Sequence, residues 1–181
     1  MHLAAYYFRA HMYTLVPRQV REDLDWMADL GTEAVCLAVL EQDLVAARAN
    51  IALIGDEAAR RGMRLFAVPS RWGGLCAGAP KVPSQFAACH PETWVLKTDG
   101  SPAFSSVSGP TCSVHHPATA EFFTATLERL FAVAPFTGVV WDEPKNLNLV
   151  DASPAARQAL GSRWADPLSH REAHLAFLGE C

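Results

Sequence analysis

The chain has 181 residues, half of them hydrophobic, and a net charge of −4, a size and composition typical of a globular protein with a hydrophobic core. The small negative charge and the lack of any basic block argue against nucleic acid or an anionic membrane as a partner. No apolar run approaches the roughly 20 residues that span a bilayer, and the N-terminal residues do not predict a secretory signal peptide.

The five cysteines form an odd set without a Cys-x-x-Cys pair. This pattern favours neither a zinc ribbon nor a disulfide framework. Cys36 lies within an apolar run, and we expect it to be a small buried side chain. The cysteine usage therefore predicts a reducing compartment, and we expect a cytoplasmic protein.

The first seventy residues alternate between predicted strands and helices. Strands are expected at residues 4–10, 33–40 and 64–70, because each is a short apolar run. Helices are expected at residues 16–31 and 44–62, where apolar residues recur at helical spacing and a glycine ends the range. The order is therefore strand, helix, strand, helix, strand.

The rest of the chain continues this alternation after a long interruption. Residues 71–117 are rich in Gly, Pro and Ser, but their aromatic residues favour an ordered, packed loop. A third helix is expected at 118–135 and a fourth strand at 137–144. A final helix is expected to begin with Ser169 as its N-cap and Glu172 at the spacing of a capping box.

Apolar strands that alternate with helices predict a parallel α/β sheet with right-handed crossovers. Neither a Gly-x-Gly-x-x-Gly motif nor a Walker motif occurs, which argues against a dinucleotide- or NTP-binding fold. A (β/α) barrel fits better, with only the first four of its eight units present. We expect residues 1–181 to form a single (β/α) domain, either a half-barrel or a truncated TIM barrel. A homodimer or the remainder of a longer protein would then close its sheet.

Polar side chains follow each of the four predicted strands. Active sites of parallel barrels lie at the carboxyl ends of the strands, so these residues form the candidate site. They are Arg9 and His11 after the first strand, Glu41 after the second, Ser70, Arg71 and Trp72 after the third, and Asp142 and Glu143 after the fourth. A solvated strand end explains Glu41 alone, whereas two adjacent carboxylates favour chemistry.

The two carboxylates are predicted to have different roles. Side chains alternate along a strand, so only one of Asp142 and Glu143 can point fully towards the axis of a barrel. We predict that Glu143 is the general acid/base, because a neighbouring tryptophan and a partly desolvated pocket would raise its carboxyl pKa. Asp142 is then expected to orient a substrate hydroxyl or to pair with Arg9 or Arg71.

Six residues are predicted to bind substrate: Arg9, His11, Arg71, Trp72, Trp141 and Lys145. Arginine and histidine can bond hydroxyl groups, and tryptophan offers a flat platform for a pyranose ring. Trp72 stands beside two glycines at a strand end and is equally consistent with a core role. For Tyr6, Trp26 and Trp94 a role in the core or in anchoring a loop is favoured.

Several short motifs resemble those of known proteins. The stretch Trp141–Asn146, WDEPKN, resembles the end of strand four in the retaining (β/α)8 glycoside hydrolases, with Asp142 where those enzymes usually have Asn. The middle segment is similar to the hypothetical glycosyl hydrolase-like barrel proteins through three ordered motifs: His90–Trp94 (HPETW), Asp99–Pro102 (DGSP) and Cys112–Pro117 (CSVHHP). The resemblance covers roughly residues 4–146. It implies a carbohydrate-directed barrel with Glu143 as general acid/base.

Hydrolysis of a glycoside needs a second carboxylate, about 5 Å from the first in retaining enzymes. In the retaining clan this nucleophile comes from strand seven, and only four strands are expected here. Asp142 is poorly suited to replace it, because neighbouring residues on a strand diverge. We therefore expect these 181 residues to need a further part of the protein for hydrolysis.

Two other functions stay open. His11, His115, His116, Asp142 and Glu143 are residue types that bind divalent metals, so a metal-dependent sugar isomerase or epimerase is one alternative, although their spacing is not that of a strong metal motif. The other alternative is a non-catalytic half-barrel that binds carbohydrate. The favoured interpretation, a glycoside hydrolase-like protein, requires neither a metal nor an organic cofactor.

Overall fold

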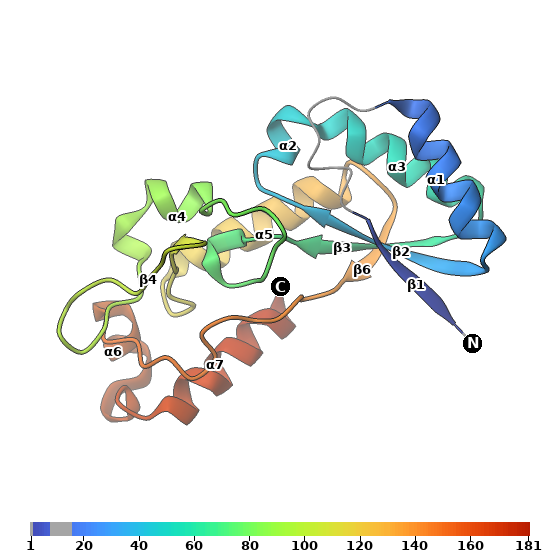
Figure 1. Cartoon of the computed structure of the whole chain (residues 1–181). Coiled ribbons are helices and arrows are strands. Elements are labelled where there is room, and N and C mark those ends of the chain that lie inside the picture. Colours follow the sequence, from blue (N-terminus) through green and yellow to red (C-terminus); the bar gives the residue numbers. More distant parts are fainter. Residues whose placement is uncertain (1, 8–15) are drawn as a thin grey trace. The chain divides into compact units, whose positions relative to one another are not determined.

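The computed structural model describes residues 2–7 and 16–181 (Figure 1). The chain divides into two compact units. The first unit comprises Met1–Ser70 and Glu128–Asp142, and the second unit comprises Arg71–Leu127 and Glu143–Cys181. Among the described residues, no helix has the length and the apolar character needed to cross a membrane.

The first unit is built on a parallel sheet with the strand order β1-β2-β3-β6. The strands are β1 (Leu3–Tyr7), β2 (Thr32–Val39), β3 (Arg64–Pro69) and β6 (Phe136–Val139). All neighbouring strands run parallel, and their order in the sheet follows the order along the chain. This confirms the predicted parallel α/β sheet and is consistent with part of a (β/α) barrel.

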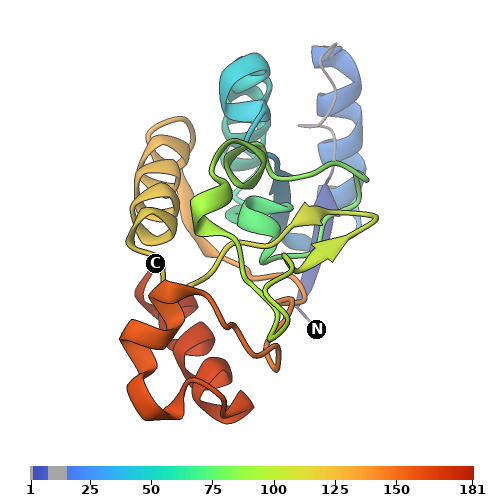
Figure 2. The ribbon, with the colours of Figure 1, turned by 90° about the vertical axis from the view of Figure 1, so that its left-hand side faces the viewer.

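Helices cover one face of this sheet (Figures 1 and 2). They are α1 (Pro17–Asp29), α2 (Asp43–Ala46) and α3 (Arg48–Arg60). The single helix predicted for residues 44–62 is wrong, because the chain leaves the helical conformation at Ala47, with φ −130° and ψ 23°. Alanine favours helices, so nothing in the local sequence signals this break.

The core of the first unit lies between the sheet and its helices. Alternate residues of β2 and β3 point towards the helices and are buried: Val35, Leu37, Val39, Leu65 and Ala67. The residues between them form a smaller cluster that consists of Cys36, Ala38 and Val68. Cys36 is buried with a free thiol, in agreement with the sequence. The sheet therefore has a helix-covered face and a second face, which we call the open face.

A buried ion-pair network joins α1 and α3. The Glu57 carboxylate is buried and accepts hydrogen bonds from Arg21 at 3.0 Å, Arg60 at 2.7 Å and Arg61 at 2.9 Å. These bonds, led by the one from Arg61, hold the pKa of Glu57 below its usual value. A buried carboxylate with three cationic partners is satisfied, so we assign Glu57 a structural role.

The second unit contains the segment expected as a long ordered loop. Its elements are α4 (Gln85–Cys89), the hairpin strands β4 (Phe104–Ser105) and β5 (Gly109–Pro110), most of α5 (Pro117–Phe131), α6 (Pro154–Leu160) and α7 (Pro167–Glu180). Helix α6, which the sequence analysis missed, is capped by Ser153. The predicted N-cap of the last helix is wrong: Asp166, not Ser169, accepts the bonds from the first turn of α7.

Aromatic rings form the core of the second unit. Trp72 is 0% exposed and lies 6.1 Å from Phe122 and 6.0 Å from Phe123 between ring centroids. Phe86 stacks on Phe122 at 4.2 Å, and Phe177 of α7 meets Phe123 edge-on at 5.1 Å. These contacts tie α4, α5 and α7 together.

Candidate functional site

The predicted site residues fall into three groups. Arg9 and His11 lie outside the residues that the structure describes. Those of the first unit are Glu41, Ser70, Trp141 and Asp142, and those of the second unit are Arg71, Trp72, Glu143 and Lys145. Each unit therefore carries its own candidate site.

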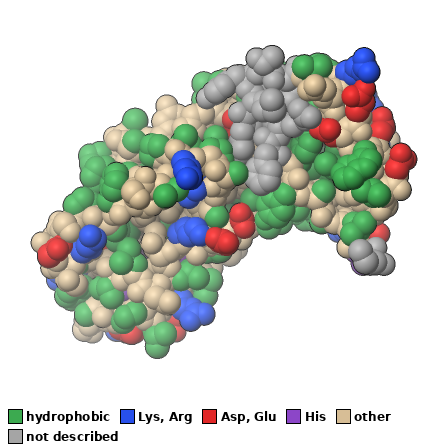
Figure 3. All heavy atoms as spheres, viewed as in Figure 1, with side chains coloured by type: hydrophobic (Ala, Val, Ile, Leu, Met, Phe, Trp, Pro, Cys, Tyr) green, Lys and Arg blue, Asp and Glu red, His purple; other side chains and the backbone are tan. Residues whose placement is uncertain are grey.

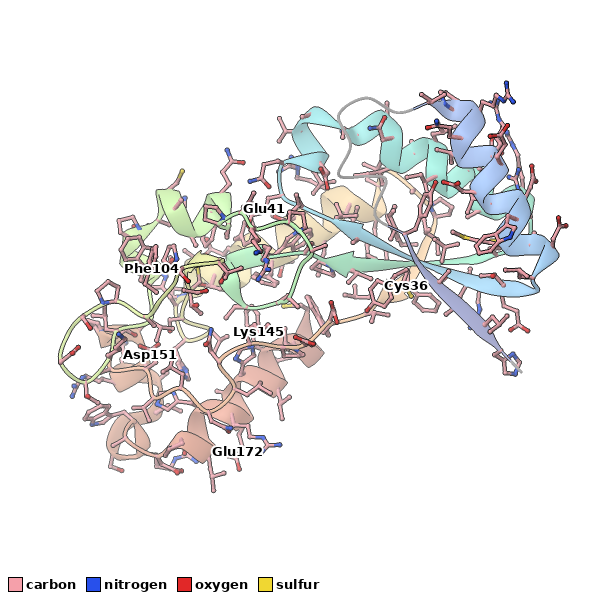
Figure 4. All side chains as sticks on the ribbon, in the orientation of Figure 1. Cys36, Glu41, Phe104, Lys145, Asp151 and Glu172 are labelled. Atoms are coloured by element: carbon pink, nitrogen blue, oxygen red, sulfur yellow. The ribbon has the colours of Figure 1, made fainter. Side chains whose placement is uncertain are left out.

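The open face of the first unit is identified by the strand register. Tyr6 pairs with Cys36 across β1 and β2, and Cys36 pairs with Phe66 across β2 and β3, so these three side chains share one face. Tyr6 is 46% exposed, which contradicts the core role favoured for it. Figure 4 shows Cys36 on the sheet beside β1. The partly exposed phenol of Tyr6 thus lies on the same face as the apolar cluster of Cys36, Ala38 and Val68.

Asp142 lies on this open face. The backbone of Val140 still bonds to Ala67 at 2.8 Å, and its side chain packs against the Cys36, Ala38 and Val68 cluster. Asp142 follows two residues later, beyond the end of β6 at Val139, and continued alternation would keep it on the same side. Burial raises the pKa of Tyr6, and the charge of Asp142 raises it further. The effect of this charge indicates that the two side chains lie near each other.

Two more polar residues end strands of the first unit in buried positions. Ser70 follows β3 on the open face, two residues after Val68, and its buried Oγ has no hydrogen-bond partner among the described residues. Glu41 follows β2 and is also buried, so the solvated strand end suggested for it is wrong. The carboxyl ends of these strands therefore carry a carboxylate, a phenol and a hydroxyl on one face.

Glu143 does not have the environment that the sequence predicted for it. Its side chain is 72% exposed and forms an ion pair with Lys145. This bond holds the pKa of Glu143 below its usual value, which reverses the predicted rise. Its backbone has φ +39°, so the extended conformation ends here. An exposed, ionised carboxylate is poorly suited to donate a proton to a leaving group at neutral pH.

The predicted tryptophan platforms differ in their surroundings. Trp72 is enclosed by phenylalanine rings, and a buried indole offers no face to a sugar, so its position favours the core role. Trp94 is half-buried, and its Nε1 donates to the carbonyl oxygen of Ala87 at 2.6 Å. Trp141 is half-buried next to Asp142.

The second unit brings Arg71 and Lys145 together in one pocket of about 450 Å³. Lys97 and Asn146, which the sequence analysis did not select, line the same pocket. The Nε of Arg71 donates to the carbonyl oxygen of Pro80 at 3.1 Å. The Nδ2 of Asn146 donates to Thr111 Oγ1 at 3.0 Å. We call this the basic pocket.

A histidine cluster lines a smaller cavity of about 20 Å³ in the second unit. His115 Nε2 lies 3.1 Å from His170 Nδ1, and His170 Nε2 lies 2.6 Å from the carbonyl oxygen of Trp164. His174 Nε2 and Asp151 Oδ2 are buried without a partner among the described residues. A cavity of this size has room for about one water molecule, which could bridge such groups.

We expect acid to destabilise the second unit through His174. Burial, with a smaller contribution from His115, lowers the pKa of His174 from 6.5 to about 4. His174 is therefore protonated below about pH 6.5 in the unfolded chain but only below about pH 4 in the folded chain. The free energy of unfolding should fall over this range, by about 3 kcal/mol if His174 acts alone.

Chemical denaturation at pH 7.5, 6, 5 and 4 measures this loss. His174→Gln should flatten the dependence on pH, because it removes the group whose pKa burial lowers. The groups that face His174 across the cavity are His115, His170 and Asp151. Equal slopes for wild type and His174→Gln would assign the acid sensitivity to one of those groups.

The structure gives no support to a metal centre among the residues that it describes. In that part of the chain, no group of three or more His, Cys, Asp or Glu side chains is placed to hold a metal ion. His115 contacts His170, whereas Asp142 and Glu143 belong to different units. His11, the remaining candidate ligand, is outside the described residues.

Comparisons with known proteins show a fold but no family. No protein-family model matches the sequence, and no curated protein matches it. Solved structures do match. They include an α-galactosidase from Lactobacillus brevis, with a TM-score of 0.61 and 10% identity over 99% of this chain and 24% of that chain. The GH36 α-galactosidase AgaB from Geobacillus stearothermophilus matches with a TM-score of 0.63 and 14% identity, over 99% and 26% of the two chains.

A third match is the noncanonic maltogenic α-amylase AmyB from Thermotoga neapolitana. Its TM-score is 0.54 with 12% identity, over 76% of this chain and 38% of that chain. The chain thus spans about a quarter of the length of the α-galactosidases that it matches. At these identities the likeness establishes a glycoside hydrolase-like fold.

Three residues of the candidate sites were missed or misjudged, for two reasons. Asn146 is the last residue of the WDEPKN stretch, and Lys97 lies two residues before the DGSP turn. Their clustering with Arg71 depends on distant segments meeting, which the sequence does not show. Tyr6 was judged on its apolar neighbours, whereas its exposure depends on which face of the sheet the helices cover.

Proposed function

We propose that this chain forms part of a carbohydrate-active, glycoside hydrolase-like barrel in which Asp142 supplies a catalytic carboxylate. The position of Asp142 carries the proposal. It follows the fourth parallel strand on the face opposite the helices, which faces the axis in a closed barrel. Active sites of such barrels lie at this end of the strands.

The neighbours of Asp142 suit a sugar substrate. Tyr6 and Ser70 share its face and offer hydroxyl groups that can bond to sugar hydroxyls. Ser70 Oγ is buried without a partner among the described residues, and such a group is stabilised when a ligand hydroxyl bonds to it. Asp142 would be one of the two carboxylates that glycoside hydrolysis requires. Glu143 is exposed and ion-paired with Lys145, so we do not propose it as one of the two catalytic carboxylates.

A screen for glycosidase activity tests the proposal directly. The complete natural protein that contains this chain should be assayed against chromogenic α- and β-glycosides, with galactosides and glucosides first. We expect at least one substrate to be cleaved at a rate that Asp142→Asn removes. Cleavage that Asp142→Asn leaves unchanged would assign the reaction to other residues.

A non-catalytic carbohydrate-binding protein is the second candidate. The basic pocket favours it, because that pocket is formed by the second unit alone and does not depend on Asp142. Saccharide binding without cleavage of any glycoside in the screen would support this candidate over the enzyme.

A further inference from the structure

We infer that the basic pocket of the second unit binds a sugar that carries an oxyanion, such as a uronate or a sugar phosphate. The carbohydrate part of this inference rests on the proposed function, while the anion part rests on the pocket. With about 450 Å³, the pocket lies in the size range of small-molecule sites.

Three cations from separate segments converge on this pocket. Arg71 follows β3, Lys97 begins the turn before β4, and Lys145 follows β6. Among the described residues that line the pocket, none is acidic. Cations of this kind attract and bond an oxyanion, and arginine can do so with two parallel hydrogen bonds. Figure 3 shows Lys and Arg side chains on the visible face of this unit.

Backbone hydrogen bonds hold two of the lining residues in position, Arg71 and Lys145. The Arg71 amide donates to the carbonyl oxygen of Ala77 at 3.1 Å, and its Nε donates to that of Pro80. The Lys145 amide donates to the carbonyl oxygen of Leu75 at 2.8 Å. The side-chain bond orients the Arg71 guanidinium before a ligand arrives, which lowers the entropy cost of binding. The Lys145 ammonium is held by its ion pair with Glu143, which a ligand oxyanion would share.

Unfavourable backbone conformations concentrate at this pocket. Arg71 and Asn146 line it, and each has a φ of +63°. Glu143, with φ +39°, is the ion-pair partner of a third lining residue, Lys145. These three are the non-glycine residues with positive φ in the described chain. Backbone strain of this kind is found preferentially at functional sites.

Gly74 lies where two backbone segments of the pocket wall pack closely against each other. It has φ +69°, and a Cβ at this position would lie 2.6 Å from the carbonyl oxygen of Pro110. Only glycine therefore fits here. The wall is held by the approach of two backbone segments and not by flexible side chains.

An aromatic ring completes the pocket. Phe104 lies in β4, lines the pocket and is 67% exposed (Figure 4). Its flat face can pack on the apolar side of a pyranose ring while the cations bond the anionic substituent. The three cations alone would bind any small anion. Because Phe104 can pack against a ring, we infer an anion that carries a sugar ring.

Titration of isotope-labelled protein, followed by NMR chemical shifts, tests this inference. Glucuronate and glucose 6-phosphate are the anionic sugars, glucose is the neutral control, and inorganic phosphate is the control without a ring. We expect at least one of the two anionic sugars to bind at least tenfold more tightly than either control. Higher salt should weaken binding, because exposed charges are screened.

Lys97→Gln should weaken this binding about tenfold, the effect of losing one charged hydrogen bond. Lys97 is exposed, so the variant should fold. Lys81→Gln is the matched control, since Lys81 is an exposed lysine of the same unit outside this pocket. Equal affinity of wild type and Lys97→Gln would overturn the assignment of the site.

The remaining outcomes separate this inference from the proposed function. Equal affinity for glucose and glucuronate would overturn the anion part, while cleavage of neutral glycosides would still support the enzyme. Phosphate that binds as tightly as glucose 6-phosphate would overturn the sugar part. Anionic sugars that bind to a protein without glycosidase activity would uphold the pocket and refute the enzyme.

Discussion

Replacement of Asp142 by asparagine is expected to reduce glycoside hydrolysis roughly a thousandfold or more, because an amide of the same shape can neither attack an anomeric carbon nor accept a proton. Glu143→Gln is the matched variant at the adjacent position and should lose less than about tenfold. The two residues differ because Asp142 shares the open face with Tyr6, whereas Glu143 is exposed and paired with Lys145.

Steady-state kinetics of both variants on one cleaved substrate measure the difference. A loss in kcat with little change in KM is the signature expected for Asp142→Asn, since binding contacts remain. The opposite ranking, with Glu143→Gln inactive and Asp142→Asn active, would restore the assignment that the sequence favoured. A matching thermal transition for both variants ensures that the comparison concerns chemistry and not folding.

Trp72→Ala is expected to lower the free energy of unfolding of the second unit by about 3–5 kcal/mol, the usual cost of removing a large buried aromatic ring. The loss is large because Trp72 is fully enclosed and contacts two phenylalanines of α5. Trp26→Ala is the control, since Trp26 on α1 is 63% exposed and should cost far less.

Denaturant unfolding, followed by circular dichroism, measures both variants. A sugar platform at Trp72 would give the reverse result, with near-normal stability and a loss of saccharide affinity. Trp72→Phe separates volume from ring identity, because it keeps an aromatic ring in the core and should recover much of the stability.

Local patterns in the sequence predicted most elements of the first unit. The apolar runs around Val35 and Leu65 indicated buried parallel strands, and the spacing of Val20 and Leu24 indicated α1. These signals succeed because strand and helix periodicity is a property of neighbouring residues. The break at Ala47 carried no such signal, since alanine favours the helix that ends there.

The candidate site was harder to predict than the fold. The sequence predicted that the two carboxylates of WDEPKN come at the carboxyl side of the fourth strand, which is confirmed, although the strand ends at Val139 and not at residue 144. The preference between the two carboxylates depended on which face the helices cover. That choice is made by packing of α1 and α3 against one side of the sheet. The pKa of Glu143 depended in turn on Lys145, two residues away, folding back towards it.

The sequence by itself determined most strands and helices of the first unit and that carboxylates follow the fourth strand, because period and order along the chain encode both. Tertiary structure decided that Asp142 and not Glu143 shares a face with Tyr6, that Trp72 is core, and that Arg71, Lys97 and Lys145 meet in one pocket. Each of these depends on contacts between segments far apart in the chain, and such contacts leave no local pattern to detect.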